Sequence, residues 1–238
     1  MFWWLLKFVL LGPVLRLVYR PRARGVENIP DRGGAILAAN HLSALDTLLL
    51  PVVVRRRKVV FLGKAELFDR WYSAWFFRAV GVIPVGRGQG SAAEDALRAA
   101  VAALGQGQLV GIFPEGTRSP DGRLYRGKTG VARMALQARV AVILVGIVGT
   151  RKERGAGRKR HIEIRFGKAL DFGRYHGHPD DRFVARAVTD EVMYEIMLLS
   201  GQEYVDEYAD RVKERVAGGP APAPEASRRP GQSERSRR

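Results

Sequence analysis

The sequence of 238 residues contains no cysteine. This absence excludes disulfide bonds, a thiolate nucleophile and zinc sites built from cysteine ligands. Histidine is scarce as well, with four residues in the whole chain. Three of them, His161, His176 and His178, lack the spacing of a helical metal site. We therefore expect no bound metal.

Acidic residues are few, with 24 Asp and Glu against 40 Lys and Arg, which gives a net charge of +16. Such an excess attracts polyanions: nucleic acid, anionic lipid headgroups or an acidic carrier protein. Interleaved basic and aromatic patches are absent from the soluble part of the sequence, so we expect no nucleic-acid partner. Residues 217–238, rich in Pro, Ala and Arg, are expected to form a disordered basic tail.

The N-terminal segment is apolar, yet it lacks a run of the roughly 20 residues that a membrane-spanning helix needs. Gly12-Pro13 divides it into two short helical pieces. Its aromatic and basic side chains favour the headgroup layer of a membrane: Trp3, Trp4, Tyr19, Arg20, Arg22 and Arg24. We expect residues 1–24 to form a monotopic two-helix membrane motif on the cytoplasmic face of the inner membrane. The alternative is a helical hairpin that packs on the protein's own core.

Short apolar segments alternate with helical patterns through residues 25–216. We expect strands at residues 35–39, 59–62, 82–85, 109–113, 140–148 and 162–166, and helices at 43–54, 71–80, 91–104, 130–138 and 181–216, the last broken near Gly201. The continuous apolar run at 140–148 is typical of a central strand covered on both faces, and 162–166 alternates like a strand nearer the edge. The pattern predicts an α/β domain with a mostly parallel central sheet flanked by helices.

A polar segment, Asn-His-Leu-Ser-Ala-Leu-Asp, follows the first predicted strand at residues 40–46. In α/β sheets ligands bind at the carboxyl ends of strands. His41 and Asp46 can meet only if His41 lies in the loop and Asp46 in the first helical turn, which Ser43 would supply as the N-cap. Two interpretations stay open. Asp46 is a capping acid, or it orients His41 as a general base that deprotonates an acceptor hydroxyl.

A second candidate, Phe-Pro-Glu-Gly-Thr-Arg-Ser at residues 113–119, comes directly after a predicted buried strand. Gly116 lets backbone amides approach a ligand, and Arg118 can hold a phosphate through paired hydrogen bonds. The alternative is an ordinary tight turn in which Glu115 and Arg118 form an ion pair. Arg87 also follows a strand end, although an isolated arginine there is more typical of surface charge.

Two glycine-rich stretches match nucleotide-binding patterns imperfectly. Residues 122–129 fit the Walker A pattern, but no strand directly precedes them, and no later strand ends in an aspartate for magnesium. Residues 86–90 follow a strand, yet their third glycine comes one residue too early for a dinucleotide loop. Neither stretch is expected to bind a nucleotide.

Together these segments resemble the glycerolipid acyltransferase family, whose typical member is 1-acylglycerol-3-phosphate (lysophosphatidic acid) acyltransferase. The resemblance covers roughly residues 24–170. Residues 40–46 match the family's N-H-x-S-x-x-D block, 81–87 resemble its second block, 113–119 match its third block almost letter for letter, and 128–130 resemble its K-x-G element. The sequence departs from the family in the fourth block, where Ala141 and Leu144 replace prolines of a strand that shapes the substrate channel.

The resemblance implies transfer of a fatty acyl group from acyl-CoA or acyl-acyl carrier protein to the free hydroxyl of lysophosphatidic acid, which gives phosphatidic acid for phospholipid biosynthesis. It implies that His41 and Asp46 are catalytic, and that Asn40, Ser43, Arg87, Glu115, Gly116, Thr117, Arg118 and Lys128 bind substrate. No metal or tightly bound cofactor is implied, and the partners are a phospholipid surface, the lysolipid and the acyl carrier. The alternatives are an enzyme of the same family that acts on another lysolipid or glycolipid, and a non-catalytic membrane lipid-binding protein.

Overall fold

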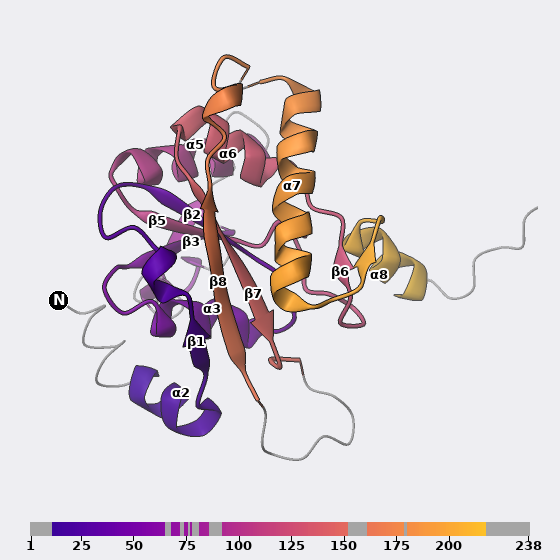
Figure 1. Cartoon of the computed structure of the whole chain (residues 1–238). Helices are drawn as coiled ribbons and strands as arrows, with labels where there is room; N and C mark the ends of the chain where they lie inside the picture. The colour runs from indigo at the N-terminus through magenta and orange to yellow at the C-terminus, as the bar shows by residue number, and fades with distance from the viewer. Residues whose placement is uncertain are drawn as a thin grey trace, which may run out of the picture.

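The computed structural model describes residues 11–64, 68–71, 74–75, 77, 81–85, 92–151, 161–178 and 180–217. These residues form a seven-stranded sheet in the order β1-β8-β7-β2-β5-β3-β4 (Figure 1). Its strands are β1 (Arg22–Arg24), β2 (Ala35–Ala39), β3 (Val59–Lys64), β4 (Val82–Val85), β5 (Leu109–Ile112), β7 (Val142–Val148) and β8 (Glu163–Leu170). All neighbouring strands run parallel except β7 and β8, which are antiparallel. The predicted α/β class and mostly parallel sheet are confirmed.

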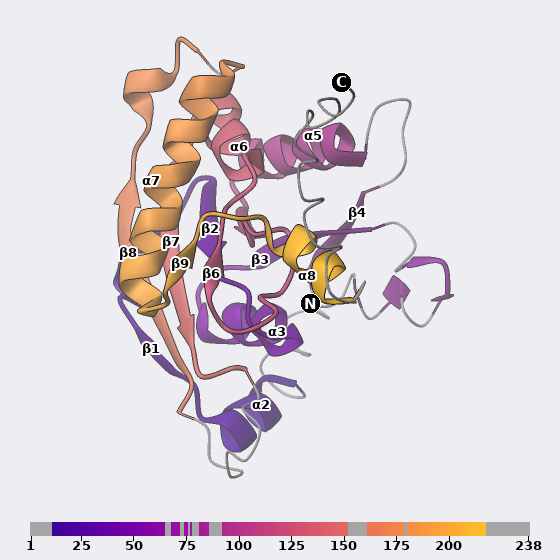
Figure 2. The same cartoon turned by 90° about the vertical axis from the view of Figure 1, so that its right-hand side faces the viewer.

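Helices cover both faces of this sheet (Figure 2). They are α2 (Leu11–Tyr19), α3 (Ala44–Val53), α5 (Ala92–Gly105), α6 (Gly130–Ala138), α7 (Arg182–Ser200) and α8 (Ala209–Ala217), with short 3-10 turns at Val26–Asn28 and Gly173–Tyr175. Buried side chains of α5, α6 and α7 share one hydrophobic cluster. Those of α2 and α3 belong to a second cluster on the other face. The described residues 71, 74, 75 and 77 of the predicted helix at 71–80 are helical.

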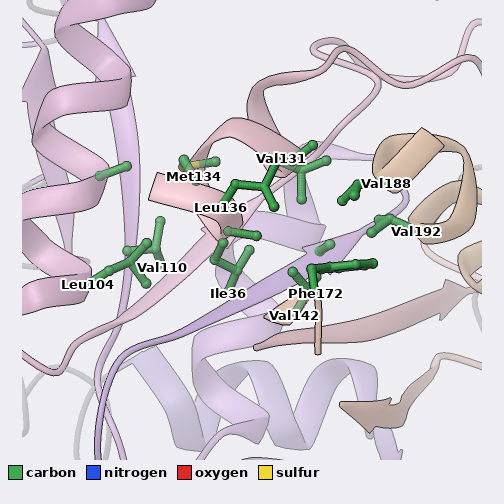
Figure 3. Packing of buried hydrophobic residues seen from close by; sticks show 14 of the residues in the cluster. Ile36, Leu104, Val110, Val131, Met134, Leu136, Val142, Phe172, Val188 and Val192 are labelled. Carbon is green, nitrogen blue, oxygen red and sulfur yellow. The ribbon is translucent and has the colours of Figure 1, made fainter. Parts of the chain in front are cut away.

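The strand β7 contributes to both clusters. Val142 and Leu144 lie in the cluster under α6 and α7, where Figure 3 shows Val142 beside Ile36 and Phe172. Ile143 and Val145 lie in the cluster under α3. A strand whose alternate side chains are buried on opposite faces is covered on both sides. This confirms the interpretation of the apolar run at residues 140–148. The strand predicted at 162–166 is also confirmed, and it extends to Leu170 next to the edge strand β1.

The fourth-block position 144 coincides with an irregularity in the sheet. The β7–β8 ladder shifts register between Ile143 and Val145. Proline is tolerated in strands mainly at bulges and edges, because it cannot donate a ladder hydrogen bond. Leu144 occupies this position fully buried in the core. The departure from the family prolines is therefore compatible with an intact central strand.

The helical pattern at residues 181–216 is broken where the sequence predicts it. α7 ends at Ser200, and Gly201 takes the left-handed conformation with a φ of 72°. Between α7 and α8, a two-residue strand β9 (Tyr204–Val205) pairs in parallel with β6 (Leu124–Tyr125). Strands this short carry no periodic signal. β6 lies inside the Walker-like stretch at residues 122–129, which is therefore not a loop between a strand and a helix.

At the N-terminal end, α2 is the second of the two predicted helical pieces, and residues 1–10 lie outside the described residues. Leu15 is buried against the sheet domain, whereas Val14, Leu17 and Val18 are exposed. Residues 22–24, predicted as part of the membrane motif, instead form β1 and pair with β8. Their exposed side chains show no alternation, so the sequence pattern could not reveal this pairing. Of the predicted tail at 217–238, Ala217 ends α8 instead, and residues 218–238 lie outside the described residues.

Within the described ranges, every helix is too short or too polar to cross a membrane.

Candidate functional site

The two polar segments meet at one edge of the sheet. β2 and β5 are parallel neighbours, so the loops that follow them emerge side by side. The backbone N–H of His41 donates to Glu115 Oε1 at 2.9 Å. The carbonyl of His41 accepts from the backbone N–H of Ser119 at 2.7 Å. The loop at residues 113–119 therefore holds the backbone of His41 from both sides.

Asp46 connects the helix cap with the histidine. Its side chain is fully buried, and its Oδ2 accepts from the backbone N–H groups of Leu42 and Ser43, each at 2.7 Å. The same oxygen lies 3.0 Å from His41 Nδ1. Ser43 is the N-cap of α3, and its Oγ accepts from the N–H of Leu45 at 3.3 Å. One carboxylate oxygen thus accepts from the N-terminal backbone of the helix cap and contacts His41 as well. The catalytic role of the pair stays a prediction.

The imidazole of His41 is held in a defined orientation. Its ring stacks on Phe113 with 4.0 Å between the centroids and 14° between the planes. Because an ionised carboxylate can only accept, the contact with Asp46 assigns the proton of the neutral ring to Nδ1. Nε2 then keeps a lone pair, and the side chain is 15% exposed. This arrangement can accept a proton from a hydroxyl group that reaches Nε2.

Asn40, predicted to bind substrate, is fully buried at the end of β2. Its Oδ1 accepts from the N–H of Ile147 at 2.6 Å, and its Nδ2 donates to the carbonyl of Ile147 at 2.8 Å. Nδ2 also donates to Gln202 Oε1 at 2.6 Å. These contacts tie β2 to β7 and to the segment after α7, so they position the loop of His41. The predicted role of Asn40 in substrate binding stays a prediction.

Glu115 is fully buried and bridges two loops. Its Oε1 accepts from His41, and its Oε2 accepts from the backbone N–H of Tyr125 at 3.0 Å. Burial raises the pKa of Glu115 to about 7. The two backbone hydrogen bonds and the charge of Lys213 lower that pKa, and the negative charge of Asp46 raises it. Within the described residues Glu115 forms no ion pair with Arg118, unlike the tight-turn alternative.

The backbone favours glycine at position 116, at the tip of the same loop. Its φ of 72° lies in the left-handed region, which strains residues with a side chain. A Cβ placed there would also lie 3.1 Å from both Cδ and Cε of Lys128. Lys128 in turn pairs with Asp210 of α8, with 2.7 Å between Nζ and Oδ2. The predicted substrate-binding residues Gly116 and Lys128 are therefore direct neighbours.

Two of the remaining predicted residues lie in this loop, and one lies outside the described residues. Thr117 is half-buried, and its Oγ1 accepts from Lys213 Nζ at 2.7 Å. Arg118 is exposed. Arg87 lies outside the described residues. In the part of the chain that is described, His, Asp and Glu form no group of three that could hold a metal ion.

Sequence reasoning missed Gln202, Asp210 and Lys213. The first contacts Asn40, and the other two bring α8 to the loop at residues 113–119. Lys213 is 96 positions away from Thr117 in sequence. Neither residue type nor spacing marks these positions, because α8 has the composition of an ordinary charged surface helix.

The loops at residues 40–46 and 113–119 lie within a region that is similar to known proteins. Residues 20–148 match the sequence model of the family described as Acyltransferase. The chain is 34% identical over 135 residues to the chloroplastic 1-acyl-sn-glycerol-3-phosphate acyltransferase LPAT1 of Arabidopsis thaliana, covering 56% of this chain and 37% of that protein. It is 31% identical over 109 residues to the 1-acyl-sn-glycerol-3-phosphate acyltransferase of Bacillus subtilis, covering 45% of this chain and 54% of that protein. The chain thus spans about half or less of these relatives' lengths.

One solved structure has a similar fold. It is the crystal structure of the 1-acyl-sn-glycerophosphate acyltransferase PlsC from Thermotoga maritima, with a TM-score of 0.58 and 24% sequence identity. The similarity covers 79% of this chain and 76% of that one. At this identity the likeness supports the fold.

The buried carboxyl of Glu115 predicts a specific pH dependence of stability. Its pKa is about 7 in the folded protein, above the usual value of about 4.3 in an unfolded chain. Its stabilising contribution is therefore complete below about pH 4.3 and is lost as the pH rises through about 7. Relative to Glu115→Gln, we expect the unfolding free energy of the wild type to fall by about 3 kcal/mol between pH 4.5 and 8.

The measurement is denaturant unfolding of both proteins across this pH range. The difference between the two curves isolates Glu115 from all other titrating groups, and Glu203→Gln, at an exposed position, serves as the control. Parallel curves for the wild type and Glu115→Gln would show that Glu115 ionises as freely as it does in water.

Proposed function

This chain belongs to the acyltransferase family, and we propose that it transfers a fatty acyl group from a thioester to the free hydroxyl of 1-acylglycerol-3-phosphate. The donor is acyl-CoA or acyl-acyl carrier protein, and the product is phosphatidic acid. The relatives in Arabidopsis thaliana and Bacillus subtilis bear names that state this acyltransferase activity. The chain spans only part of their lengths, so the same activity is a proposal for this chain.

The observation that carries this proposal is the contact between His41 and the buried carboxylate of Asp46. With Nδ1 held 3.0 Å from Asp46 Oδ2, the lone pair of Nε2 is available to a substrate. Asp46 stabilises the imidazolium that forms when His41 accepts a proton. The chain has no cysteine to form a thioester intermediate, and its dyad needs no nucleophile from the protein. Direct attack by the acceptor hydroxyl is the simplest mechanism for this pair.

In the proposed reaction, His41 Nε2 takes the proton of the acceptor hydroxyl, and the hydroxyl oxygen attacks the carbonyl carbon of the thioester. The carbon–oxygen bond forms, the carbon–sulfur bond breaks, and the sulfur leaves as a thiolate. The imidazolium of His41 returns the proton to this thiolate, so the enzyme ends in its starting state. Backbone amides near Gly116 are candidates for stabilising the negative oxygen of the tetrahedral intermediate.

We propose that the phosphate of the acceptor lies against the loop at residues 113–119. Arg118 is exposed there, and Lys128 packs over Gly116. Arginine binds phosphate through paired hydrogen bonds, and lysine supplies a point charge. This loop holds the backbone of His41 through Glu115, so a phosphate bound to it would keep the glycerol hydroxyl within reach of the dyad. Arg87 is expected to contribute from the second block.

We propose that the protein works on the cytoplasmic face of the inner membrane as a monotopic protein. Val14, Leu17 and Val18 expose an apolar strip of α2. Beside this helix lies a cavity of about 750 Å³ whose lining includes Arg16, Arg55, Arg56 and Arg57. Apolar side chains next to a basic surface favour the interface of a bilayer with anionic lipids.

Acyl transfer by membranes that contain the protein tests the activity. With labelled acyl-CoA or acyl-acyl carrier protein and 1-acylglycerol-3-phosphate, we expect the wild type to form phosphatidic acid. His41→Ala removes the general base and should lower kcat by about 10²- to 10⁴-fold. His41-dependent transfer to a different lysolipid would change the acceptor and keep the chemistry. Equal activity of wild type and variant would exclude the dyad mechanism.

Asp46→Asn separates the two roles of Asp46. The amide oxygen can still accept from Leu42 and Ser43, but the negative charge is lost. An amide nitrogen also replaces the buried Oδ1, for which the described residues provide no hydrogen-bond partner. We expect a loss of about 1–3 kcal/mol of stability and at least about a hundredfold in kcat, measured by unfolding and by initial rates.

Asp181→Asn is the matched control for this substitution. Asp181 caps α7 through the N–H groups of Phe183 and Val184, in an exposed position on another helix. Asparagine caps about as well as aspartate, so this variant should keep both its stability and its activity. If Asp46→Asn behaved like Asp181→Asn, Asp46 would be a capping residue alone.

Binding to lipid vesicles tests the membrane proposal. Leu17 is 73% exposed on α2, and Leu17→Glu adds a charge to the apolar strip. We expect this variant to float less with vesicles of phosphatidylglycerol and phosphatidylethanolamine than the wild type does. Leu198→Glu, at a leucine of α7 that is 56% exposed, should leave flotation unchanged. Equal loss by both variants, or by neither, would contradict the assigned membrane face.

A further inference from the structure

The helix α8 reaches the candidate site from a part of the chain far beyond the family match. β9 pairs in parallel with β6, with Leu124 opposite Tyr204 and Tyr125 opposite Val205. The backbone N–H of Arg126 donates to the carbonyls of Val205 and Glu207 at 3.2 Å and 3.0 Å. These contacts set the start of α8 beside β6 (Figure 2). The position of α8 follows from the backbone and is independent of any substrate contact.

Lys213 points from α8 to the loop at residues 113–119. Its Nζ donates to Thr117 Oγ1 at 2.7 Å, and the residue is half-buried. An ammonium group has three donors, and this partner is a neutral hydroxyl. Within the described residues, no carboxylate lies within 4.0 Å of Lys213 Nζ. The structure therefore holds a partly desolvated cation at the loop without an ion-pair partner.

A second cation lies next to it. Arg118 is exposed and, in the described part of the chain, takes part in no ion pair. Burial is the main cause that lowers the pKa of Lys213, and the charge of Arg118 lowers it further, whereas Glu115 and Asp210 raise it. Lys128 differs from both, because its ammonium pairs with Asp210. Glu115 and Asp210 thus offset part of the repulsion between Lys213 and Arg118, but among the described residues neither cation is in an ion pair. Two neighbouring cations of this kind form a site that a bound anion would stabilise.

We propose that Lys213 binds the phosphate of the acceptor together with Arg118 and Thr117, and that this pair of cations selects a phosphate monoester. This inference rests on the proposed function. A monoester carries a charge of about −1.5 to −2 at pH 7, whereas the phosphodiester of other lysophospholipids carries about −1. Thr117 Oγ1 uses only a lone pair in accepting from Lys213, so its hydroxyl proton is available to donate to the same phosphate.

The variant Lys213→Met tests the proposal in the full chain, because methionine keeps the apolar length of the side chain and removes the charge. Two probes separate binding from chemistry. The first is the substrate 1-acylglycerol-3-phosphate, for which kcat and KM are measured. The second is 1-acylpropanediol-3-phosphate, which carries the phosphate but lacks the acceptor hydroxyl, so that its Kd reports binding without turnover. 1-Acylglycerol serves as the ligand without phosphate.

We expect Lys213→Met to raise KM and the Kd of the phosphate probe about tenfold to a hundredfold, as the loss of a charge-assisted hydrogen bond requires. kcat should stay within about twofold, because the lost contact is made equally in the ground state and the transition state. Binding of 1-acylglycerol should not change. Lys213→Arg should restore most of the affinity for the phosphate probe.

Arg215→Met is the matched control on the same helix. Arg215 pairs with Glu207 at 2.6 Å, with both side chains about half exposed, and such surface pairs contribute little. It should leave KM and both Kd values unchanged. If Lys213 only fastened α8 to the loop, Lys213→Met would lower the melting temperature and weaken both ligands equally. That outcome, or an unchanged Kd for the phosphate probe, would overturn the proposal.

These results also separate this inference from the proposed function. A wild type that binds the phosphate probe through Lys213 but acylates no 1-acylglycerol-3-phosphate would retain the phosphate site and refute the proposed acceptor reaction. A wild type that acylates it with a KM insensitive to Lys213→Met would retain the proposed function and refute the role of Lys213.

Discussion

The carboxylate of Asp46 is the constraint on which the arrangement of the site depends. A buried carboxylate is costly unless hydrogen bonds compensate it, and its Oδ2 has three donors. Two of them are backbone groups at the start of α3, so the helix cap fixes the carboxylate before any substrate arrives. The third donor is Nδ1 of His41, so this contact sets the tautomer of the imidazole ring. Asp46 Oδ2 thus stabilises the start of α3, orients the ring of His41 and fixes the loop after β2 against the helix.

A second buried carboxyl, Glu115, lies on the other side of His41 and uses backbone donors in the same way. It differs in its ionisation. Burial and the nearby charge of Asp46 raise the pKa of Glu115 to about 7, so near neutral pH Glu115 is only partly ionised. At the exposed side of the loop that contains Glu115 lie the cations Arg118, Lys128 and Lys213. Two buried carboxyl groups therefore hold His41 from the interior, one at its ring and one at its backbone, and the cations face the proposed phosphate at the surface.

Much of the fold could be predicted because its signals are local. Apolar runs in the sequence predicted the positions of β2, β5 and β7. Glycine commonly ends helices in the left-handed conformation, and Gly201 ends α7 in this way. Short or exposed pairings escaped prediction, since β1, β6 and β9 have two or three residues each. Three residues on one exposed strand carry no periodicity that could separate them from a loop or a helix end.

The sequence by itself determined the α/β class, the capping spacing of Ser43 and Asp46, and the two loops that follow strands. These features depend on neighbours in the chain, which residue type and spacing record. The tertiary structure alone decided that Glu115 accepts from His41, 74 positions away, and that Lys213 reaches Thr117 across 96 positions. A backbone N–H has no side-chain signature, and a lysine on a charged helix resembles its neighbours. Such contacts exist only once parallel strands bring their ends to one edge of the sheet.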